Sequence, residues 1–445
     1  MNFLKIYLPY YKRNLQIAIP VILSQLGQVL VQQVDNMMVG MVGTVELAAA
    51  AFANSVFVIG MIIGMGFSFG LTPLVGHSFG AGDKQEGGRL LKNSFILNTA
   101  MALLITIALW VVSYFFDQMG QVPEVVEMAV PYYRILVLSY LPFLWFFTFK
   151  QFAEGLGDTM NAMIITLGAN VLNIVLNYAL IFGHWGFEAY GLNGAGYATF
   201  IARYAMPVAF VEVLIQRARF KEYWQIALHS GVYKSLMKKL LKVGSPISMQ
   251  MLLEVFAFSF TAIMAGWLGV VPLAAHQIAI GLATVSFMVV TGISSGTTIR
   301  VSHQFSQKDF LGLRRATYAS LQLVWTFMGL SAISFVLFRY QLPELYTHDA
   351  EVIYLAAQLL LMAALFQIFD GTQVVVLGAL RGLADVKHAM IYAFISYIIM
   401  GLPLGYLFAF MLDFGVAGLW IGLIGGLTSA ALMFYGRFRK LIALH

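Results

Sequence analysis

The sequence contains no cysteine, and only 10% of its 445 residues are charged. The missing thiols exclude disulfide bonds, cysteine-ligated zinc sites and thiol catalysis. A water-soluble domain carries about 25% charged residues. A chain that is 60% hydrophobic therefore needs a lipid bilayer around most of its surface. In such a protein the net charge of +6 reflects how cations are placed relative to the membrane, and we expect no nucleic-acid partner.

Long apolar stretches recur along the chain, and each can cross about 30 Å of hydrocarbon, which takes about 20 helical residues. They predict an all-α polytopic membrane protein with twelve transmembrane helices, at residues 15–39, 46–80, 92–116, 127–149, 160–182, 193–216, 240–266, 271–305, 316–340, 351–379, 387–411 and 415–436. The second and eighth stretches are longer than a crossing requires, so we expect tilt or kinks there. Residues 1–14 combine Lys5, Lys12 and Arg13 with aromatic side chains, which predicts an amphipathic segment on the inner leaflet.

Positive charges are distributed unevenly between the predicted loops. Because the number of spans is even, both termini lie on one side of the membrane, and most lysines and arginines fall on that side, including Lys150 and Arg381. The loops on the other side hold Arg339 and a set of acids: Glu46, Asp117, Glu124, Glu188, Glu344, Asp349 and Asp413. The positive-inside rule therefore predicts a multi-pass protein with both termini in the cytoplasm, and we expect it in the bacterial inner membrane.

The sequence repeats itself when it is shifted by 226 residues, because Pro20 then meets Pro246 and Thr72 meets Thr298. Further pairs at this offset are Gly40 and Gly266, Gly43 and Gly269, Gly70 and Gly296, Val75 and Val301, His77 and His303, and Asp83 and Asp309. A shift of 227 residues aligns Gly155-Leu-Gly-Asp158 with Gly382-Leu-Ala-Asp385. Shared hydrophobicity alone does not reproduce matches at polar and glycine positions, so we infer an internal duplication.

Each copy of the repeat contains six predicted spans, so both copies have the same orientation in the membrane. We therefore predict two six-helix lobes related by a pseudo-twofold axis along the membrane normal. The N-lobe is expected at residues 1–216, a basic cytoplasmic linker at 217–239 and the C-lobe at 240–445. Two parallel lobes favour an alternating-access carrier over a channel or an enzyme.

Few acids lie inside the predicted spans, and Asp35, Glu254 and Asp370 are the most deeply placed. A carboxylate at mid-membrane costs several kcal/mol, so each is a candidate functional residue. Glu212 lies near a helix end, where it can reach the headgroup region. The alternative reading is structural, with interhelical hydrogen bonds that hold a lobe together.

Amide side chains accompany the two acids of the second half. Gln250 lies one helical turn before Glu254, and Gln367 and Gln373 flank Asp370 at three residues on either side. This spacing places each amide on the same broad helix face as its acid. We therefore expect polar clusters rather than isolated acids.

Three asparagines, Asn170, Asn173 and Asn177, lie on one face of the fifth span. Their carbonyl oxygens are ligands of the type that hard cations prefer. Together with Asp35 and Thr199, the last two of these amides predict a small oxygen cage in the first half of the chain. The alternative is that the amides bond neighbouring helices to each other.

Four features together resemble the multidrug and toxic compound extrusion (MATE) transporters over nearly the whole chain. They are the two six-span repeats, residues 34–40 of the first span, Glu254 of the seventh span and Asp370-Gly-Thr-Gln373 of the tenth. The pair of Glu254 and Asp370 resembles the NorM-type bacterial branch. The resemblance implies a cation-coupled antiporter that exports amphipathic, often cationic drugs and toxic compounds by alternating access. It implies Na⁺ and/or H⁺ as the coupling ion, no enzymatic activity and no other cofactor.

The resemblance also implies roles for individual residues. The C-lobe cation site falls on Glu254 and Asp370, and the N-lobe site on Asp35, Asn173, Asn177, Ala195 and Thr199, so that Na⁺ would bind at one of these sets. Cargo contacts fall on Gln277 and Asp349, with Asp35, Gln250 and Gln373 as further candidates. Phe366 stands where some relatives carry a tyrosine ligand. The expected partners are small amphipathic molecules and the lipid bilayer, and the protein is expected to act as a monomer.

Two other classes of membrane protein are weighed against an exporter. A lipid-linked precursor flippase of the same superfamily would need several arginines in its cavity to hold a pyrophosphate. Away from the span ends, Arg134 and Arg203 are the only arginines inside the predicted spans. A membrane-embedded enzyme would need a nucleophile with its base or an HExxH motif, and the sequence has neither.

Overall fold

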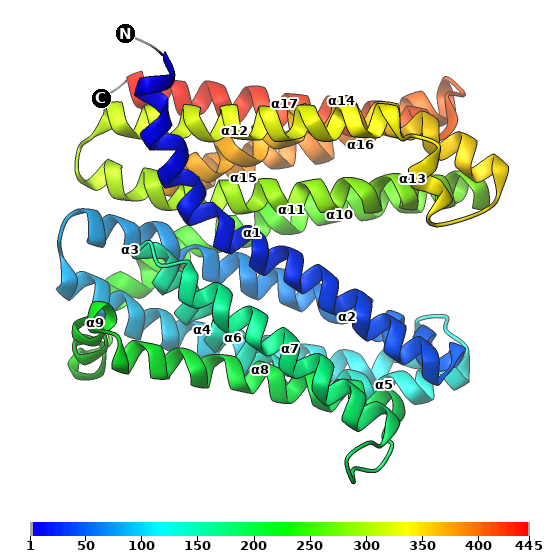
Figure 1. Cartoon of the computed structure of the whole chain (residues 1–445), viewed down its shortest axis with the longest axis horizontal. Coiled ribbons are helices and arrows are strands. Elements are labelled where there is room, and N and C mark those ends of the chain that lie inside the picture. The colour runs from blue at the N-terminus through cyan, green and yellow to red at the C-terminus, as the bar shows by residue number, and fades with distance from the viewer. Residues whose placement is uncertain (1–2, 444–445) are drawn as a thin grey trace. The chain divides into compact units, whose positions relative to one another are not determined.

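The computed structural model describes residues 3–443, and all regular secondary structure in that range is helical (Figure 1). Twelve segments are long and apolar enough to cross a membrane, which confirms the predicted number of spans. They cover Lys5–Val42, Thr44–Gly80, Lys84–Gln118, Pro123–Gly155, Met160–Phe182, Gly191–Gln216, Lys234–Trp267, Val270–Ser306, Phe310–Leu337, Ala350–Gly382, Val386–Met411 and Gly415–Ala443. The chain is an all-α, multi-pass membrane protein.

Several spans contain more than one helix. In chain order the helices are α1 (Phe3–Val42), α2 (Thr44–Phe69), α3 (Leu71–Gly80), α4 (Lys84–Val112), η1 (Ser113–Gln118), α5 (Pro123–Leu138), α6 (Tyr140–Gly155), α7 (Met160–Phe182), α8 (Gly191–Gln216), α9 (Ala218–His229), α10 (Lys234–Trp267), α11 (Val270–Ser306), α12 (Phe310–Leu337), α13 (Gln341–Glu344), α14 (Ala350–Gly382), α15 (Val386–Ala393), η2 (Phe394–Gly401), α16 (Leu402–Tyr406), η3 (Leu407–Met411) and α17 (Gly415–Ala443). The long second span is interrupted at Gly70, whereas the long eighth span is the continuous helix α11. In the eleventh span, η2 and η3 are π-helical.

The helices form two compact units, and the boundaries between them lie inside α1 and α10. The N-unit is Leu23–Ser248, and the C-unit joins the residues up to Ile22 with those from Met249 onward. The first part of α1 belongs to the C-unit because the Asn14 amide donates to Ala316 O at 2.9 Å. These boundaries differ from those of the lobes expected from span count and charge. Those lobe boundaries and the symmetry axis stay predictions.

The predicted linker contains an ordered helix, α9, which packs on α4 within the N-unit. A Cβ atom on Gly87 would lie 2.7 Å from the Tyr223 ring, so α4 needs a glycine at this point of contact. Phe220 on the same helix is fully buried. An ion pair of 2.5 Å joins Lys84 to Glu222 at the surface.

The internal repeat inferred from the sequence is visible in local structure. In the N-unit, a Cβ atom on Gly155 would lie 2.8 Å from Cβ of Val75. In the C-unit, a Cβ atom on Gly382 would lie 2.8 Å from Cβ of Val301. The matched residues therefore make the same close helix contact, once in each unit.

The same correspondence holds at two helix starts. Asp83 caps α4 by accepting a hydrogen bond from the Glu86 backbone N–H at 2.8 Å. Asp309 caps α12 by accepting one from the Gly312 backbone N–H, also at 2.8 Å. An aspartate at this position satisfies a backbone donor that the helix leaves unpaired.

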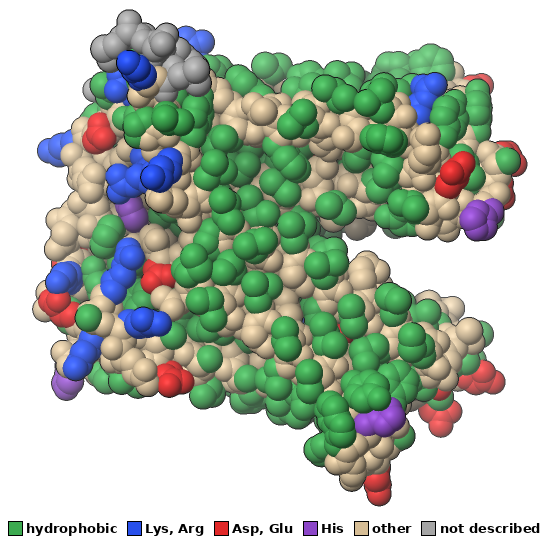
Figure 2. Space-filling model, viewed as in Figure 1, with side chains coloured by type: hydrophobic (Ala, Val, Ile, Leu, Met, Phe, Trp, Pro, Cys, Tyr) green, Lys and Arg blue, Asp and Glu red, His purple; other side chains and the backbone are tan. Residues whose placement is uncertain are grey.

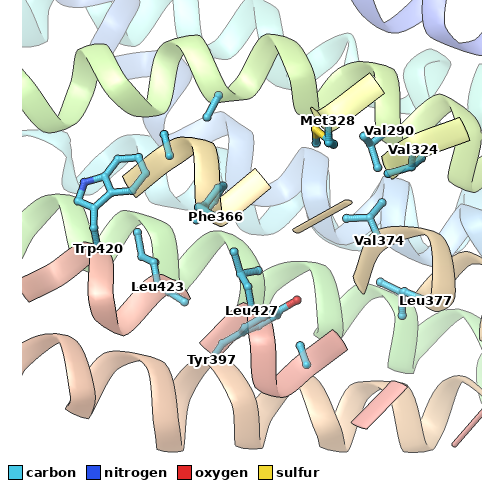
Figure 3. Close-up of a cluster of buried hydrophobic side chains, with 14 of the residues drawn as sticks. Val290, Val324, Met328, Phe366, Val374, Leu377, Tyr397, Trp420, Leu423 and Leu427 are labelled. Carbon is cyan, nitrogen blue, oxygen red and sulfur yellow. The ribbon is translucent and has the colours of Figure 1, made fainter. Parts of the chain in front are cut away.

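The apolar core of the C-unit lies between α11, α12, α14, α17 and η2 (Figure 3). The rings of Phe366 and Trp420 pack with their centroids 5.5 Å apart. Tyr397 lies in the same cluster beside Leu427, and Figure 3 shows its hydroxyl oxygen among apolar side chains. The core thus holds η2 and its tyrosine firmly against α14 and α17.

Charged side chains on the visible face of each unit gather at the helix ends, and a broad apolar band lies between them (Figure 2). In the N-unit, lysine and arginine appear at the end near α9, and acids at the end near α5. In the C-unit, most cations appear near the chain's C-terminus, and the end near α13 carries most of the acids. This is the surface expected of helices that cross a bilayer.

Candidate functional site

In the N-unit, amide groups surround the Asp35 carboxylate of α1. Asn177 on α7 donates its amide nitrogen to Asp35 Oδ1 at 2.5 Å. The Asn173 amide lies one turn away; with its nitrogen toward the carboxylate, it donates to Asp35 Oδ1 at 2.9 Å and accepts from the Thr199 backbone N–H at 3.3 Å. The structure therefore brings together Asp35, Asn173, Asn177 and Thr199.

Close packing of α7 against α8 brings these residues together. A Cβ atom on Gly194 would lie 2.8 Å from the backbone nitrogen of Ile181, so only glycine allows the two backbones to approach this closely. Ala195 follows and is buried at 3% exposure. Thr199 lies one helical turn further along α8, level with Asn173.

A cavity of about 320 Å³ opens beside the Asp35 cluster, within the N-unit. Asp35, Asn173, Ala195 and Thr199 line one part of it. Its other walls combine amide and aliphatic side chains with a group of aromatic and methionine side chains and one guanidinium: Phe57, Phe143, Phe146, Phe147, Tyr132, Met61, Met65, Met206 and Arg203. The volume lies at the lower end of the range of small-molecule pockets, about 300–1,000 Å³.

Arg203 on α8 is a cavity residue that the sequence pattern did not assign to a site. Its guanidinium donates to Ser139 Oγ at 2.7 Å. It also lies over the Phe57 ring at 5.0 Å and over the Phe143 ring at 5.2 Å. A positive charge inside a span was the sequence feature that could have indicated this residue. Sequence analysis used that charge only to judge whether the protein is a flippase.

In the C-unit, the structure brings Glu254 of α10 and Asp370 of α14 into one polar cluster. Gln250 donates to Glu254 Oε2 at 2.9 Å, and Gln373 donates to Asp370 Oδ1 at 3.2 Å. The two carboxyl groups interact electrostatically with each other. Asp370 is 3% exposed and Gln373 is fully buried, so the cluster lies inside the unit. Gln367 is also buried, and neither its amide oxygen nor its nitrogen has a hydrogen-bond partner among residues 3–443.

The cluster contains two further residues, which sequence analysis did not assign to it. Tyr397 of η2 donates its hydroxyl to Gln373 Oε1 at 3.0 Å. Arg381 of α14 donates to the Gln250 side-chain oxygen and interacts electrostatically with Glu254. Arg381 was expected in a loop, but α14 continues to Gly382 and keeps this side chain beside α10.

Phe366, the position where some MATE relatives carry a tyrosine, is an apolar core residue here. It is 3% exposed and packs against Phe258 and Trp420. Without a hydroxyl it supplies no cation ligand. The phenol oxygen of Tyr397 lies instead within reach of Gln373.

The two cargo contacts predicted outside the clusters have different surroundings. Gln277 lies on α11 with an exposed side chain. Asp349 is exposed and caps α14, where its carboxylate accepts from the Glu351 backbone N–H at 2.9 Å. In the part of the chain that the structure describes, neither side chain bonds to the Asp35 or the Asp370 cluster.

One more pair of charged residues is buried in the N-unit. Lys150 and Glu154 on α6 lie 3.9 Å apart, with side chains 5% and 4% exposed. Sequence analysis placed Lys150 at a membrane boundary, and its pairing inside α6 shows that helix to extend further than predicted. The pair neutralises itself, and we assign it a structural role.

The fold and these clusters define a multi-pass membrane transporter, with carboxylates inside its spans and a cavity beside one of them. The chain belongs to the MatE family, whose model matches residues 20–179 and 246–407.

Similar solved structures agree on the fold. One is a MATE protein in a bent conformation, with 22% sequence identity, a TM-score of 0.91, and coverage of 98% of this chain and 96% of that one. Another is an outward-facing multidrug resistance MATE transporter of the MOP superfamily, with 22% identity, a TM-score of 0.87, and 98% and 96% coverage. A third is the eukaryotic MATE transporter AtDTX14, with 18% identity, a TM-score of 0.86, and 98% coverage of both chains.

Proposed function

We propose that this MatE family member is a cation-coupled antiporter that exports amphipathic, often cationic compounds by alternating access. The observation that carries the proposal concerns Asp35, Glu254 and Asp370 inside the spans: a side-chain amide donates to one oxygen of each, and none of them forms an ion pair within residues 3–443. A carboxylate in this environment is stabilised when a cation binds to it. Both a coupling ion and a cationic cargo can supply that charge.

In the N-unit, Asp35, Asn173, Asn177 and Thr199 form the proposed cation cage, with Ala195 as its small wall residue. Na⁺ is a hard cation, and hard cations bind carboxylate, amide and hydroxyl oxygens. If H⁺ is the coupling ion, it binds to the Asp35 carboxylate. Cargo in the adjacent cavity would compete for the same carboxylate. Binding of one then lowers the affinity for the other, which couples their movements.

In the C-unit, Glu254 and Asp370 form the second proposed cation site. Glu254 Oε1 has no hydrogen-bond partner among the described residues, so this oxygen is available to an incoming ion. Two acids that interact electrostatically are stabilised when a positive ion or a proton reduces their mutual repulsion. The proposed cargo contacts are Gln250 and Gln373 within the cluster, and Gln277 and Asp349 outside it.

We further propose a bacterial inner-membrane location with both termini in the cytoplasm. The support is the uneven distribution of lysine and arginine between the ends of the spans, part of which Figure 2 shows. The paired acids Glu254 and Asp370 favour the NorM-type branch of the family. A single chain with one cage in each unit is sufficient for this mechanism, so we propose a monomer.

A flippase for lipid-linked precursors is the second candidate function, because Arg203 places a guanidinium in the N-unit cavity. Such cargo carries a pyrophosphate, whose charges call for several cations in one cavity. Arg203 is the one lysine or arginine that lines this cavity, and Asp35 lies in the same walls. The exporter therefore fits the cavity better.

The proposal is tested by transport of a fluorescent amphipathic cation, rhodamine 123, into everted membrane vesicles under separately imposed Na⁺ and H⁺ gradients. We expect uptake with at least one gradient, and loss of that gradient's effect in Asp35→Asn or in one or both of Glu254→Gln and Asp370→Asn. Glu212→Gln is the matched control, because Glu212 is an exposed acid near the end of α8, where its carboxylate accepts from the Gln216 side chain at 2.9 Å. Full gradient-driven uptake in all three site variants would contradict the assignment.

A further inference from the structure

Arg203 has no part in the proposed coupling to a cation, yet it lies in the same cavity as Asp35. The two side chains interact electrostatically but form no direct ion pair within residues 3–443. Within the described residues, its guanidinium contacts the Ser139 hydroxyl, the Met61 sulfur at 3.8 Å and two aromatic rings. None of these carries a charge.

An arginine inside a membrane span is costly unless an anion accompanies it. The guanidinium has five N–H donors in a planar fork, of which Ser139 uses one and the Met61 sulfur a second. An arginine can bind the two oxygens of a carboxylate in bidentate fashion. Asp35 interacts with Arg203 electrostatically but makes no direct ion pair with it within residues 3–443, so donors remain for a carboxylate on a bound molecule.

The cavity offers both charges to a single molecule. Asp35 attracts a basic group, Arg203 attracts an acidic group, and aromatic rings, among them Phe57 and Phe143, cover the walls near Arg203. A purely cationic compound would meet Asp35 but also the repulsion of Arg203. A purely anionic compound would meet the reverse.

We propose that the N-unit cavity selects zwitterionic aromatic compounds, with the basic group at Asp35 and a carboxylate at Arg203. This inference rests on the proposed function and adds the substrate class and the residue that sets it. Arg203 is then a specificity residue, because it attracts the carboxylate of an acid and gains no such attraction from the uncharged ester group of the corresponding methyl ester. Asp35 keeps its role in coupling.

Two dyes of the same skeleton test the inference. Rhodamine 110 carries a carboxylate together with its cationic ring system, and rhodamine 123 is its methyl ester and therefore only cationic. Binding of each dye to the purified full-length protein is measured by fluorescence anisotropy. We expect the wild-type protein to bind rhodamine 110 more tightly, and Arg203→Gln to weaken that binding by about tenfold or more. Binding of rhodamine 123 to Arg203→Gln should be unchanged or tighter.

Arg134→Gln is the matched control. Arg134 lies well inside another span of this unit, Pro123–Gly155. It also bonds to a serine hydroxyl, Ser113 Oγ at 3.1 Å, and its guanidinium lies over the rings of Trp110 and Tyr114. It does not line the cavity. This variant should keep the preference for rhodamine 110.

Arg203→Lys separates the charge from the folding role of the side chain. It should keep part of the preference for rhodamine 110, because the charge remains while the bidentate fork is lost. Binding of rhodamine 123 shows that each variant is folded.

Two results would overturn the inference: a wild-type protein that binds the ester at least as tightly as the acid, or an Arg203→Gln variant that keeps the wild-type preference. Transport into vesicles distinguishes failure of this inference from failure of the proposed function. If neither gradient drives uptake of either dye by the wild-type protein, the exporter assignment itself is contradicted.

Discussion

At the scale of single residues, side-chain amides surround the intramembrane acids. Asp35 accepts from Asn177, and Asp370 accepts from Gln373. An amide carries both a donor and an acceptor, so rotation replaces a donor with an oxygen at nearly the same place. Asn173 has partners in both orientations, since its oxygen can accept from Asn177 at 3.2 Å or its nitrogen can donate to Asp35 at 2.9 Å. We infer that such amides bond to an empty carboxylate and become ligands when a cation binds.

Asn177→Ala tests the role of an amide in the N-unit cage. It removes the 2.5 Å hydrogen bond to Asp35 and one oxygen ligand. Hydrogen bonds to charged groups contribute about 1.5–3 kcal/mol, so the concentration of coupling ion that gives half-maximal transport should rise about tenfold or more. Asn161→Ala is the control on the same helix, where the amide bonds to Asp158 at 2.7 Å. An unchanged ion requirement in Asn177→Ala would exclude this amide from the cation site.

Tyr397→Phe tests the tyrosine that sequence analysis missed. The hydroxyl holds the oxygen of the Gln373 amide, so the amide nitrogen points to Asp370. A neutral hydrogen bond contributes about 0.5–1.5 kcal/mol, which predicts a rise in the ion requirement of about twofold to tenfold. Tyr406→Phe, an exposed tyrosine of the same span, should behave as wild type. Equal effects of the two variants would contradict a role for the hydroxyl.

The sequence predicted the acids and most amides of the two clusters, but not Arg203, Arg381 and Tyr397. Acids inside apolar stretches are rare enough to stand out by themselves. An arginine near the end of a span can reach either lipid headgroups or the protein interior, and a tyrosine can face lipid or core. The packing of α8, α14 and η2 decides between these positions, and this packing cannot be predicted from sequence patterns alone.

At the scale of helices, glycines set how closely neighbouring elements pack. Gly194 lets α8 approach α7, and on α17 Gly422 lies so close to the eleventh span that a Cβ atom would be 2.6 Å from Gly401 O. The first contact shapes the Asp35 cage, and the second accompanies the π-helical turns that carry Tyr397. The length of the second span predicted a tilt or kink in it, but neither the position of its interruption at Gly70 nor the π-helical turns of the eleventh span could be predicted, because apolar content is insensitive to hydrogen-bond register.

Gly194→Val tests the contact between α7 and α8. The added side chain has no space beside Leu180 and Ile181, so α8 must move away and the Asp35 cage must widen. Overpacking of this kind costs about 1–3 kcal/mol, and we expect a lower midpoint of thermal unfolding together with a weaker response to the coupling ion. Gly168→Val on α7 is the control, because no atom lies within 4 Å of the added Cβ. Wild-type stability of Gly194→Val would show that this contact does not shape the cage.

At the scale of the whole molecule, α1 and α10 are the helices that pass from one unit into the other. The boundaries lie after Ile22 and after Ser248, which differ by 226 residues (248 − 22), the offset of the sequence repeat. Pro20 and Pro246 each lie two residues before a boundary. The sequence predicted this pairing of prolines and the duplication, but not that the units would be divided inside these helices, because hydropathy treats each span as indivisible.

Replacement of both prolines tests whether α1 and α10 bend during transport. A proline inside a helix removes one backbone hydrogen bond and favours a bend at that point. Pro20→Ala with Pro246→Ala should therefore slow transport several-fold, with little change in cargo affinity, as measured by initial uptake rates and dye binding. Pro9→Ala, at an exposed position near the start of the same first helix, is the control. A double variant with wild-type turnover would contradict a hinge at these residues.

The central claim is that binding of a positive ion at intramembrane carboxylates is exchanged for binding of cargo. The most direct measurement is ion movement driven by cargo alone, in proteoliposomes that contain the purified protein and indicators of internal Na⁺ and H⁺. A gradient of rhodamine 123 with no imposed ion gradient should drive Na⁺ or H⁺ in the opposite direction. Combining Asp35→Asn, Glu254→Gln and Asp370→Asn should abolish this movement. Cargo that crosses the membrane without any counterflow of ions in the wild-type protein would contradict the account.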